Sequence, residues 1–102
     1  MADALKARNN TDTSRFEVVV GPDVAFAEYR LGDGEITLPH TVVPEAFKGQ
    51  GVGGILAQAA LGYARANGLK VIPLCSFMAG YIAKHAEWLD IVHPDYRARV
   101  GG

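Results

Sequence analysis

The sequence contains very little cysteine and no apolar run long enough to cross a membrane. Cys75 is the only cysteine among 102 residues, so an internal disulfide is excluded and a cysteine-built zinc site is not expected. A membrane helix needs about 20 consecutive apolar residues, and no stretch approaches that length. We therefore expect a protein of the reducing cytoplasm that needs neither a metal nor a membrane.

The chain also lacks an excess of positive charge. Its formal net charge is −1, which argues against nucleic acid as a partner because phosphate-backbone binding needs a basic surplus. Acidic residues are missing altogether from Ala46 to Ala86, where four cations remain: Lys48, Arg65, Lys70 and Lys84. This local balance favours an anionic ligand of limited size, although an apolar core segment would also be poor in acids.

The length and the 49% hydrophobic content fit a single globular domain. Residues 1–14 are polar and aperiodic, and they have no apolar leader. We expect them to form a disordered tail. The folded domain is expected over residues 15–96, followed by a frayed end over residues 97–102.

Short β-rich segments dominate the first half of the domain. The stretches "RFEVVV", "VAFAEYRL" and "ITLPHTVV" are separated by turn residues, which predicts a three-stranded antiparallel meander. Pro39 lies inside the third strand and cannot donate a ladder hydrogen bond. A bulge is therefore expected near Pro39 and His40, and Pro44 should end the strand.

The second half alternates between helix and strand. Apolar residues recur at helical spacing after Val52, and Asn67-Gly68 is a natural helix stop. A short apolar strand, "LKVIPLC", follows, and then a helix from Ser76 to Val92 with Ser76 as its N-cap. Its side facing the core is expected to carry Phe77, Tyr81, Trp88 and Leu89. The fold class is thus α/β (α+β): a meander, a β-α-β unit and a C-terminal helix.

Four glycines, Gly49, Gly51, Gly53 and Gly54, stand where the first of these helices begins. The first N–H groups of a helix lack internal partners, and no capping side chain is placed there. A phosphate or pyrophosphate could accept those hydrogen bonds, whereas a tight turn packed against a neighbour would need fewer glycines. The dinucleotide fingerprint and the P-loop are excluded because the required acidic residue and G-K-[ST] ending are missing.

The stretch "KGQGVG" resembles the pyrophosphate signature [RQ]-x-x-G-x-[GA] of the GNAT superfamily of N-acyltransferases, with Lys48 in the place of Arg or Gln. The segments "GEITLPHTVV" and "VIPLCSFMAGYIAKHAEWLDIV" are similar to the small single-domain GNAT-like branch, where a His-Thr pair precedes the turn and a Cys-Ser pair follows it. The resemblance spans about Phe16 to Val92. His85-Ala86 departs from the His-Pro expected there.

The resemblance implies a co-substrate, acetyl-CoA (coenzyme A), and no metal. Its acyl arm would lie in a cleft between two splayed strands, Ile36–Val43 and Leu69–Leu74. The residues expected to bind it are Thr41, Val42, Val43, Lys48, Gly49, Gln50, Gly51, Val52, Gly53, Gly54, Ser76 and His85.

Three side chains are candidates for the chemistry, and each has a structural alternative. Cys75 is an acyl-accepting nucleophile or a small core residue. Tyr81 protonates the leaving thiolate or is an ordinary core aromatic. His40, expected beside the thioester carbonyl, is a general base or a satisfied half-buried histidine. His85 is a structural or adenosine-side residue rather than a base.

The activity expected from these residues is acetyl transfer from the thioester to an amine. The alternative is an acyl-CoA-binding module that senses or carries its ligand without useful turnover. The connection "GPD" between the first two strands is too short to form the floor of an acceptor site. The acceptor is therefore expected to be an exposed protein amine or a small polyamine, with the protein a monomer or a homodimer whose second subunit completes the site.

Overall fold

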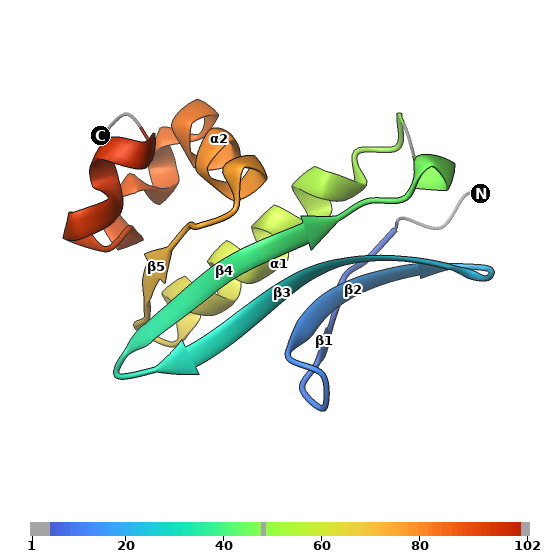
Figure 1. Ribbon diagram of the computed structural model, residues 1–102, viewed down its shortest axis with the longest axis horizontal. Coiled ribbons are helices and arrows are strands. Elements are labelled where there is room, and N and C mark those ends of the chain that lie inside the picture. The colour runs from blue at the N-terminus through green and yellow to red at the C-terminus, as the bar shows by residue number, and fades with distance from the viewer. Residues whose placement is uncertain (1–4, 48, 101–102) are drawn as a thin grey trace.

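The computed structural model describes residues 5–47 and 49–100, which form one twisted five-stranded sheet with helices on one side (Figure 1). The strand order is β1-β2-β3-β4-β5, with β5 parallel to β4 and the other neighbours antiparallel. The elements, in chain order, are β1 (Arg8–Asn10), β2 (Arg15–Val20), β3 (Asp23–Gly32), β4 (Glu35–Val42), η1 (Glu45–Phe47), α1 (Val52–Ala66), β5 (Lys70–Ile72), α2 (Ser76–Lys84), η2 (Ala86–Ile91) and η3 (Pro94–Val100). The predicted meander and β-α-β unit are confirmed. Within the described chain, no helix is both long and apolar enough to span a bilayer.

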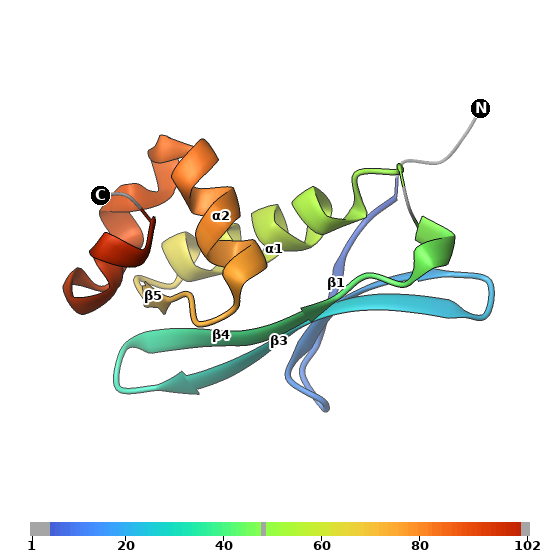
Figure 2. The same ribbon diagram turned by 45° about the horizontal axis from the view of Figure 1, so that its top comes forward.

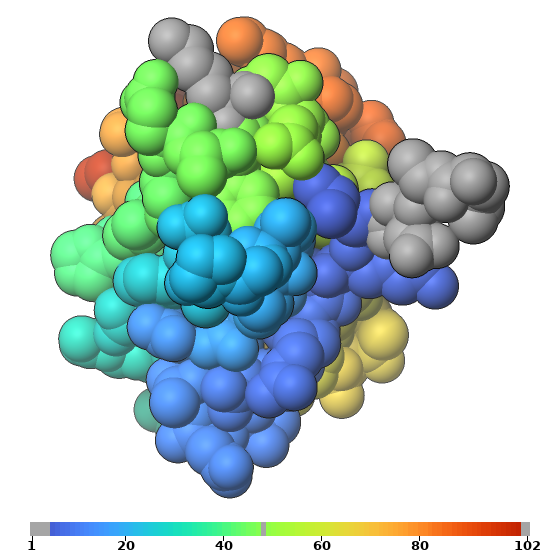
Figure 3. Space-filling model, turned by 90° about the vertical axis from the view of Figure 1, so that its right-hand side faces the viewer, coloured from blue at the N-terminus to red at the C-terminus, as the bar shows by residue number. Residues whose placement is uncertain are grey.

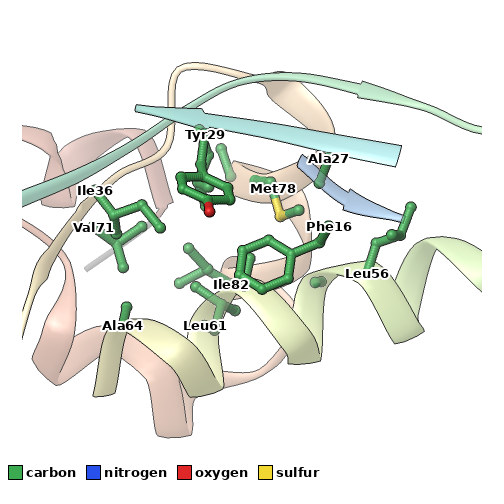
Figure 4. Close-up of a cluster of buried hydrophobic side chains, with 14 of the residues drawn as sticks. Phe16, Ala27, Tyr29, Ile36, Leu56, Leu61, Ala64, Val71, Met78 and Ile82 are labelled. Atoms are coloured by element: carbon green, nitrogen blue, oxygen red, sulfur yellow. The ribbon is translucent and has the colours of Figure 1, made fainter. Parts of the chain in front are cut away.

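The two faces of the sheet differ because side chains alternate along each strand. One face packs against α1 and α2 (Figure 2), and we call it the covered face. Its strand residues are nearly inaccessible to solvent: Phe16, Val18, Ala25, Ala27, Tyr29, Ile36, Leu38 and Val71. Figure 4 shows Phe16 between the strands and the α1 residues Leu56 and Leu61. The opposite face, which we call the open face, carries Arg15, Glu17, Phe26 and Val42.

The predicted bulge lies in β4. Glu28 pairs with His40 and Arg30 pairs with Thr37, so two residues of β4, Leu38 and Pro39, stand opposite Tyr29. The bulge accommodates a proline that has no N–H for the ladder. β4 then ends at Val42, before Pro44, as expected.

Both chain ends are more ordered than the sequence suggested. The expected tail over residues 1–14 instead supplies β1, which pairs with β2 in antiparallel register. Asn9 accepts a 2.7 Å hydrogen bond from the Tyr29 hydroxyl, so polar contacts hold a segment that has no apolar pattern. At the other end η3 buries Val100, and Arg99 donates to the Leu74 carbonyl. Residues 1–4 and 101–102 lie outside the described residues.

The last predicted helix is shorter than expected, and of the four residues expected on its core side Tyr81, Trp88 and Leu89 pack half-buried against the core while Phe77 does not. α2 ends at Lys84, and a separate 3-10 helix, η2, carries Trp88 and Leu89. Cys75, not Ser76, occupies the N-cap position. The buried residues of α2 are Met78, Ala79 and Ile82, whereas Phe77 is 40% exposed. Phe77 is therefore the aromatic side chain of α2 that lies outside the core.

Candidate active site

The glycine turn enters α1 through two residues in the left-handed region. Gly49 has φ +81° and Gly51, the N-cap of α1, has φ +70°. Apart from the chain neighbours, no atom of the residues that the structure describes lies within 4 Å of the position that a Cβ would take at either residue. Side-chain-bearing residues pay a conformational penalty in this region, and the free space above the turn suits a ligand. Lys48 lies outside the described residues.

Backbone N–H groups at the start of α1 are hydrogen-bond donors that no side chain of the described residues occupies. Within the described residues, no side chain caps its first turn, and that turn contains no acidic residue. The N–H groups of Val52, Gly53 and Gly54 therefore lack helical acceptors. The Val52 side chain is buried, so only its backbone is available to a ligand. The Gln50 amide donates to the Ala46 carbonyl at 3.1 Å and thereby ties the turn back to η1. Figure 3 shows η1 and the beginning of α1 side by side at this end of the molecule.

Gly53 and Gly54 lie close to side chains of α2. A Cβ at Gly53 would lie 2.7 Å from Cζ of Phe77, and a Cβ at Gly54 would lie 3.8 Å from Cε2 of Tyr81. The first turn of α1 thus lies close to the Phe77 and Tyr81 rings of α2. Packing explains Gly53, which a neighbouring ring requires, and the turn explains Gly49 and Gly51, whose φ values are positive; the anion site stays a prediction.

Strands β4 and β5 separate where the acyl arm was expected. Their ladder covers three pairs and ends at Thr37 and Ile72, while β4 continues to Val42. One more backbone contact follows, from the Cys75 N–H to the Leu38 carbonyl at 3.0 Å. Beyond this point β4 has a strand neighbour only on the β3 side. Its other edge therefore offers backbone groups to a ligand next to the exposed Val42 and Val43.

Cys75 lies where the two strands part. Its side chain is half-buried, and its thiol donates a 3.4 Å hydrogen bond to the Thr41 hydroxyl. Thr41 faces Ala27 across the ladder and is therefore on the covered face. The sequence placed these two residues in one cleft, but it did not predict the contact between their side chains.

His40 does not join this cluster, contrary to our expectation. It pairs with Glu28, which pairs with Arg15 on the open face, and its side chain is exposed. Neighbouring residues of a strand point to opposite faces, so His40 points away from the face that holds Thr41 and Cys75. The bulge is where it was predicted, but it does not turn the imidazole toward the cleft.

Tyr81 and His85 share one side of α2, as their spacing predicted. Their rings stack with centroids 4.0 Å apart and an interplanar angle of 15°. The Tyr81 carbonyl lies 2.8 Å from Nδ1 of His85. Because a carbonyl only accepts, Nδ1 carries the hydrogen, and Nε2 of the neutral ring is the acceptor. Ser76, at the start of this helix, is exposed. In the described ranges, no group of three or more His, Cys, Asp or Glu side chains could hold a metal ion.

Comparison with known proteins identifies the class to which a protein of this fold belongs, the acyltransferases. The family model described as GCN5-related N-acetyl-transferase matches residues 15–91. The solution NMR structure of a GCN5-like candidate N-acetyltransferase from Staphylococcus aureus is 30% identical to this chain, with a TM-score of 0.70. The match covers 90% of this chain and 91% of that one. The chain belongs to the GCN5-related N-acetyltransferase family.

Proposed function

We propose that this protein transfers an acetyl group from acetyl-CoA to an amine. The observation that carries the proposal is the uncapped glycine turn of α1 beside the separated strands, with Cys75 at the point of separation. An anionic pyrophosphate fits the free N–H groups at the start of α1, because the helix dipole is positive there. An amide-containing arm fits the unpaired edge of β4 between Leu38 and Val43.

The reaction requires a C–N bond to form as the thioester C–S bond breaks. In direct attack, the amine nitrogen adds to the acetyl carbonyl, loses a proton, and the coenzyme leaves as a thiolate that takes one up. In the covalent route, the Cys75 thiolate first displaces the coenzyme thiolate and forms an acetyl-cysteine. The amine then adds to the acetyl carbonyl and loses a proton, and the Cys75 thiolate leaves. Tyr81, on α2, is the residue proposed to return a proton to the leaving coenzyme sulfur in either route.

One observation keeps the acyl-CoA-binding module as a second candidate. His40, the base expected from the sequence, lies on the open face and not beside Cys75. A protein that binds acetyl-CoA without a base at the thioester would carry or sense it. The acceptor of the enzyme would itself have to be an amine that is already deprotonated when it attacks.

Turnover with labelled acetyl-CoA and a panel of amines separates these two functions. We expect acetylated amine to appear together with one free coenzyme thiol per transfer, followed with a thiol reagent. Tight binding of acetyl-CoA with no thiol release from any amine would support the binding module. Absence of measurable acetyl-CoA binding would refute both.

Binding at the glycine turn is tested by a pair of matched glycines. Gly51 and Gly34 both have positive φ, +70° and +76°, and at both residues the space that a Cβ would occupy is open. Changing either residue to alanine should cost about 1–2 kcal/mol through the same backbone strain. Only Gly51→Ala should also weaken acetyl-CoA binding in calorimetry, since Gly34 lies in the β3–β4 turn. Equal affinities for the two variants would remove the turn from the site.

A further inference from the structure

The Thr41 hydroxyl is the one side-chain hydrogen-bond partner of the Cys75 thiol among the residues that the structure describes. The sulfur and the oxygen are 3.4 Å apart. Thr41 lies near the end of β4, and Cys75 directly precedes α2. In the same described ranges, no histidine, carboxylate or ammonium group hydrogen-bonds to this sulfur. A group that helps this thiol to ionise therefore has to be sought in Thr41.

Main-chain hydrogen bonds fix the position of this pair. The Cys75 N–H donates to the Leu38 carbonyl at 3.0 Å, and the Cys75 carbonyl accepts from the Ala79 N–H at 3.1 Å. Thr41 is paired with Ala27 in the ladder between β3 and β4. Both side chains are half-buried. The hydroxyl and the thiol are thus held together by the backbone, which is the arrangement that a working site requires.

The donor and acceptor roles within this pair can reverse, because a hydroxyl both donates and accepts. In the neutral pair the thiol donates to the Thr41 oxygen. Once the thiol has lost its proton, the sulfur only accepts, and the Thr41 O–H rotates to donate to it. Hydrogen bonds to charged groups are stronger than those between neutral groups. The contact therefore favours the thiolate, which is the nucleophilic form of cysteine.

The start of α2 acts in the same direction. Cys75 is the N-cap of this nine-residue helix, whose first turn contains no acidic residue. The N-terminal end of a helix carries partial positive charge and favours a nearby anion. Removing the Thr41 hydroxyl leaves the helix in place, so the contribution of the hydroxyl can be measured separately.

We propose that Thr41 is a positioning residue that acts through Cys75: its hydroxyl donates to the thiolate and raises the fraction of the protein that carries the nucleophile. The inference rests on the proposed function, because it concerns the thiol of the covalent route. The Cys75 thiol gives its proton to water, which reaches the half-buried side chain. A sulfur electron pair then forms the bond to the acetyl carbon while the bond from that carbon to the coenzyme sulfur breaks, and the coenzyme leaves as a thiolate. This route needs no imidazole at the sulfur, in keeping with the position of His40 on the open face.

The role of Thr41 is tested by the pH dependence of thiol reactivity in the free protein. Cys75 is the only cysteine, so dithiodipyridine, a disulfide that releases a coloured product, reports on it alone. Thr41→Val removes the hydroxyl and keeps the branched shape. At neutral pH this variant should react about threefold more slowly, because a roughly tenfold lower thiolate fraction is partly offset by a more nucleophilic thiolate. Above about pH 10, where cysteine thiols are mostly ionised, it should react about threefold faster. A change in packing or access would not make the two profiles cross.

Further variants separate the hydroxyl from packing. Thr41→Ser keeps the hydroxyl and should restore the wild-type profile, whereas Thr41→Ala, a second variant without it, should cross the wild type as Thr41→Val does. Thr37→Val is the matched control in the same strand. Thr37 lies between the buried residues Ile36 and Leu38 and therefore points to the open face. Its loss should leave the reactivity of Cys75 unchanged at every pH.

Acetyl-CoA connects this thiol to the proposed function. Incubated with acetyl-CoA and no acceptor at neutral pH, the wild type and Thr41→Ser should form the acetyl adduct on Cys75 about threefold faster than Thr41→Val. Intact-protein mass spectrometry follows the adduct. Calorimetry should give the three proteins equal affinities for acetyl-CoA, because Thr41 acts on the sulfur and not on the coenzyme.

Two results would overturn the assignment while leaving the proposed function intact. The first is a Thr41→Val profile that equals the wild type or is slower by one factor at every pH. The second is a Thr41→Ser profile that matches Thr41→Val, which would assign the effect to packing. A wild type that binds no acetyl-CoA would overturn the proposed function, whereas crossing thiol profiles would still identify Thr41 as the partner of the Cys75 thiolate.

Discussion

The two faces of the sheet are built from the same strands, but their side chains are shielded from water in different ways. On the covered face, residues such as Ala27, Tyr29 and Leu38 are at most 3% exposed and pack against the helices. On the open face, Glu17 is also buried, but polar groups surround it: it accepts hydrogen bonds from Arg15 and Asn10. The Arg15 guanidinium in turn covers the Phe26 ring at 4.1 Å.

This difference shows on which face reactive side chains can be held away from water. The candidate site occupies the edge of the covered face, where Cys75 donates hydrogen bonds to the Thr41 hydroxyl and to the Leu38 carbonyl. The open face has no helix to exclude water, and its side chains shield one another instead. A residue on it, such as His40, is separated from the cleft by the sheet itself.

The difference between the two faces predicts that the largest effect will come from a pair of substitutions in β4. Leu38→Ala removes a covered-face side chain that is 1% exposed, and it should lower the free energy of unfolding by about 2–5 kcal/mol. Val42→Ala removes an open-face side chain that is 44% exposed, and it should change stability by less than about 0.5 kcal/mol. Urea denaturation measures both. Similar losses would show that the open face is also a packed interface.

The next effect concerns Cys75 at the edge of the covered face. If the acetyl group passes through the thiol, Cys75→Ala should lower turnover about a hundredfold or more, because the nucleophile is lost. Cys75→Ser should lose turnover but still bind acetyl-CoA. Intact-protein mass spectrometry of the wild type, without acceptor, should show a base-labile acetyl adduct. Near-normal turnover of Cys75→Ala would leave direct attack, with Tyr81→Phe then the variant to test.

A smaller effect is expected from the buried carboxylate of the open face. The hydrogen bond from Arg15, above all, lowers the pKa of Glu17 below its ordinary value of 4.5. A lowered pKa means that the folded state favours the charged carboxylate, so this stabilisation is present above the unfolded-state pKa and is lost as the pH falls through the folded-state pKa.

Glu17→Gln should therefore cost on the order of 1 kcal/mol at neutral pH. The difference from the wild type should shrink as the pH is lowered from about 5 into the acid range. Urea denaturation at several pH values measures it. A difference that stays constant with pH would mean that the charge of Glu17 contributes nothing to stability.

The smallest effect is predicted for His40. Because its side chain is exposed on the open face, His40→Ala should change turnover by less than about twofold and stability by less than about 0.5 kcal/mol. The measurement is steady-state acetyl transfer at saturating acetyl-CoA. A tenfold fall in turnover would show that the imidazole reaches the reacting groups from the open face, and the separation of the two faces would then be wrong.

Local patterns in the sequence were enough to predict much of the fold. Short β-rich segments between turn residues predicted β2, β3 and β4, Pro39 predicted the bulge, and Asn67-Gly68 predicted the end of α1. β1 was missed because its contacts are polar: Asn10 binds Glu17, and Asn9 binds Tyr29, twenty residues away. The spacing of residues within the segment itself gives no indication of such distant partners.

The site was predictable in part. The glycine turn follows from residue types alone, since several glycines at a helix start imply unusual φ values and exposed backbone donors. The position of Phe77 was misjudged, because Phe77 and Met78 are both apolar and only packing decides which is buried.

The sequence by itself determined the order of the elements from β2 to α2, the bulge in β4, the glycine turn and the acid-free segment, because each depends on the chemistry of a few neighbouring residues. The tertiary structure decided which residues meet: it brought the Cys75 thiol to Thr41 and placed His40 on the opposite face. The physical reason is that a bulge and a strand register together fix the face of each side chain, and the register depends on pairing between segments distant in the chain.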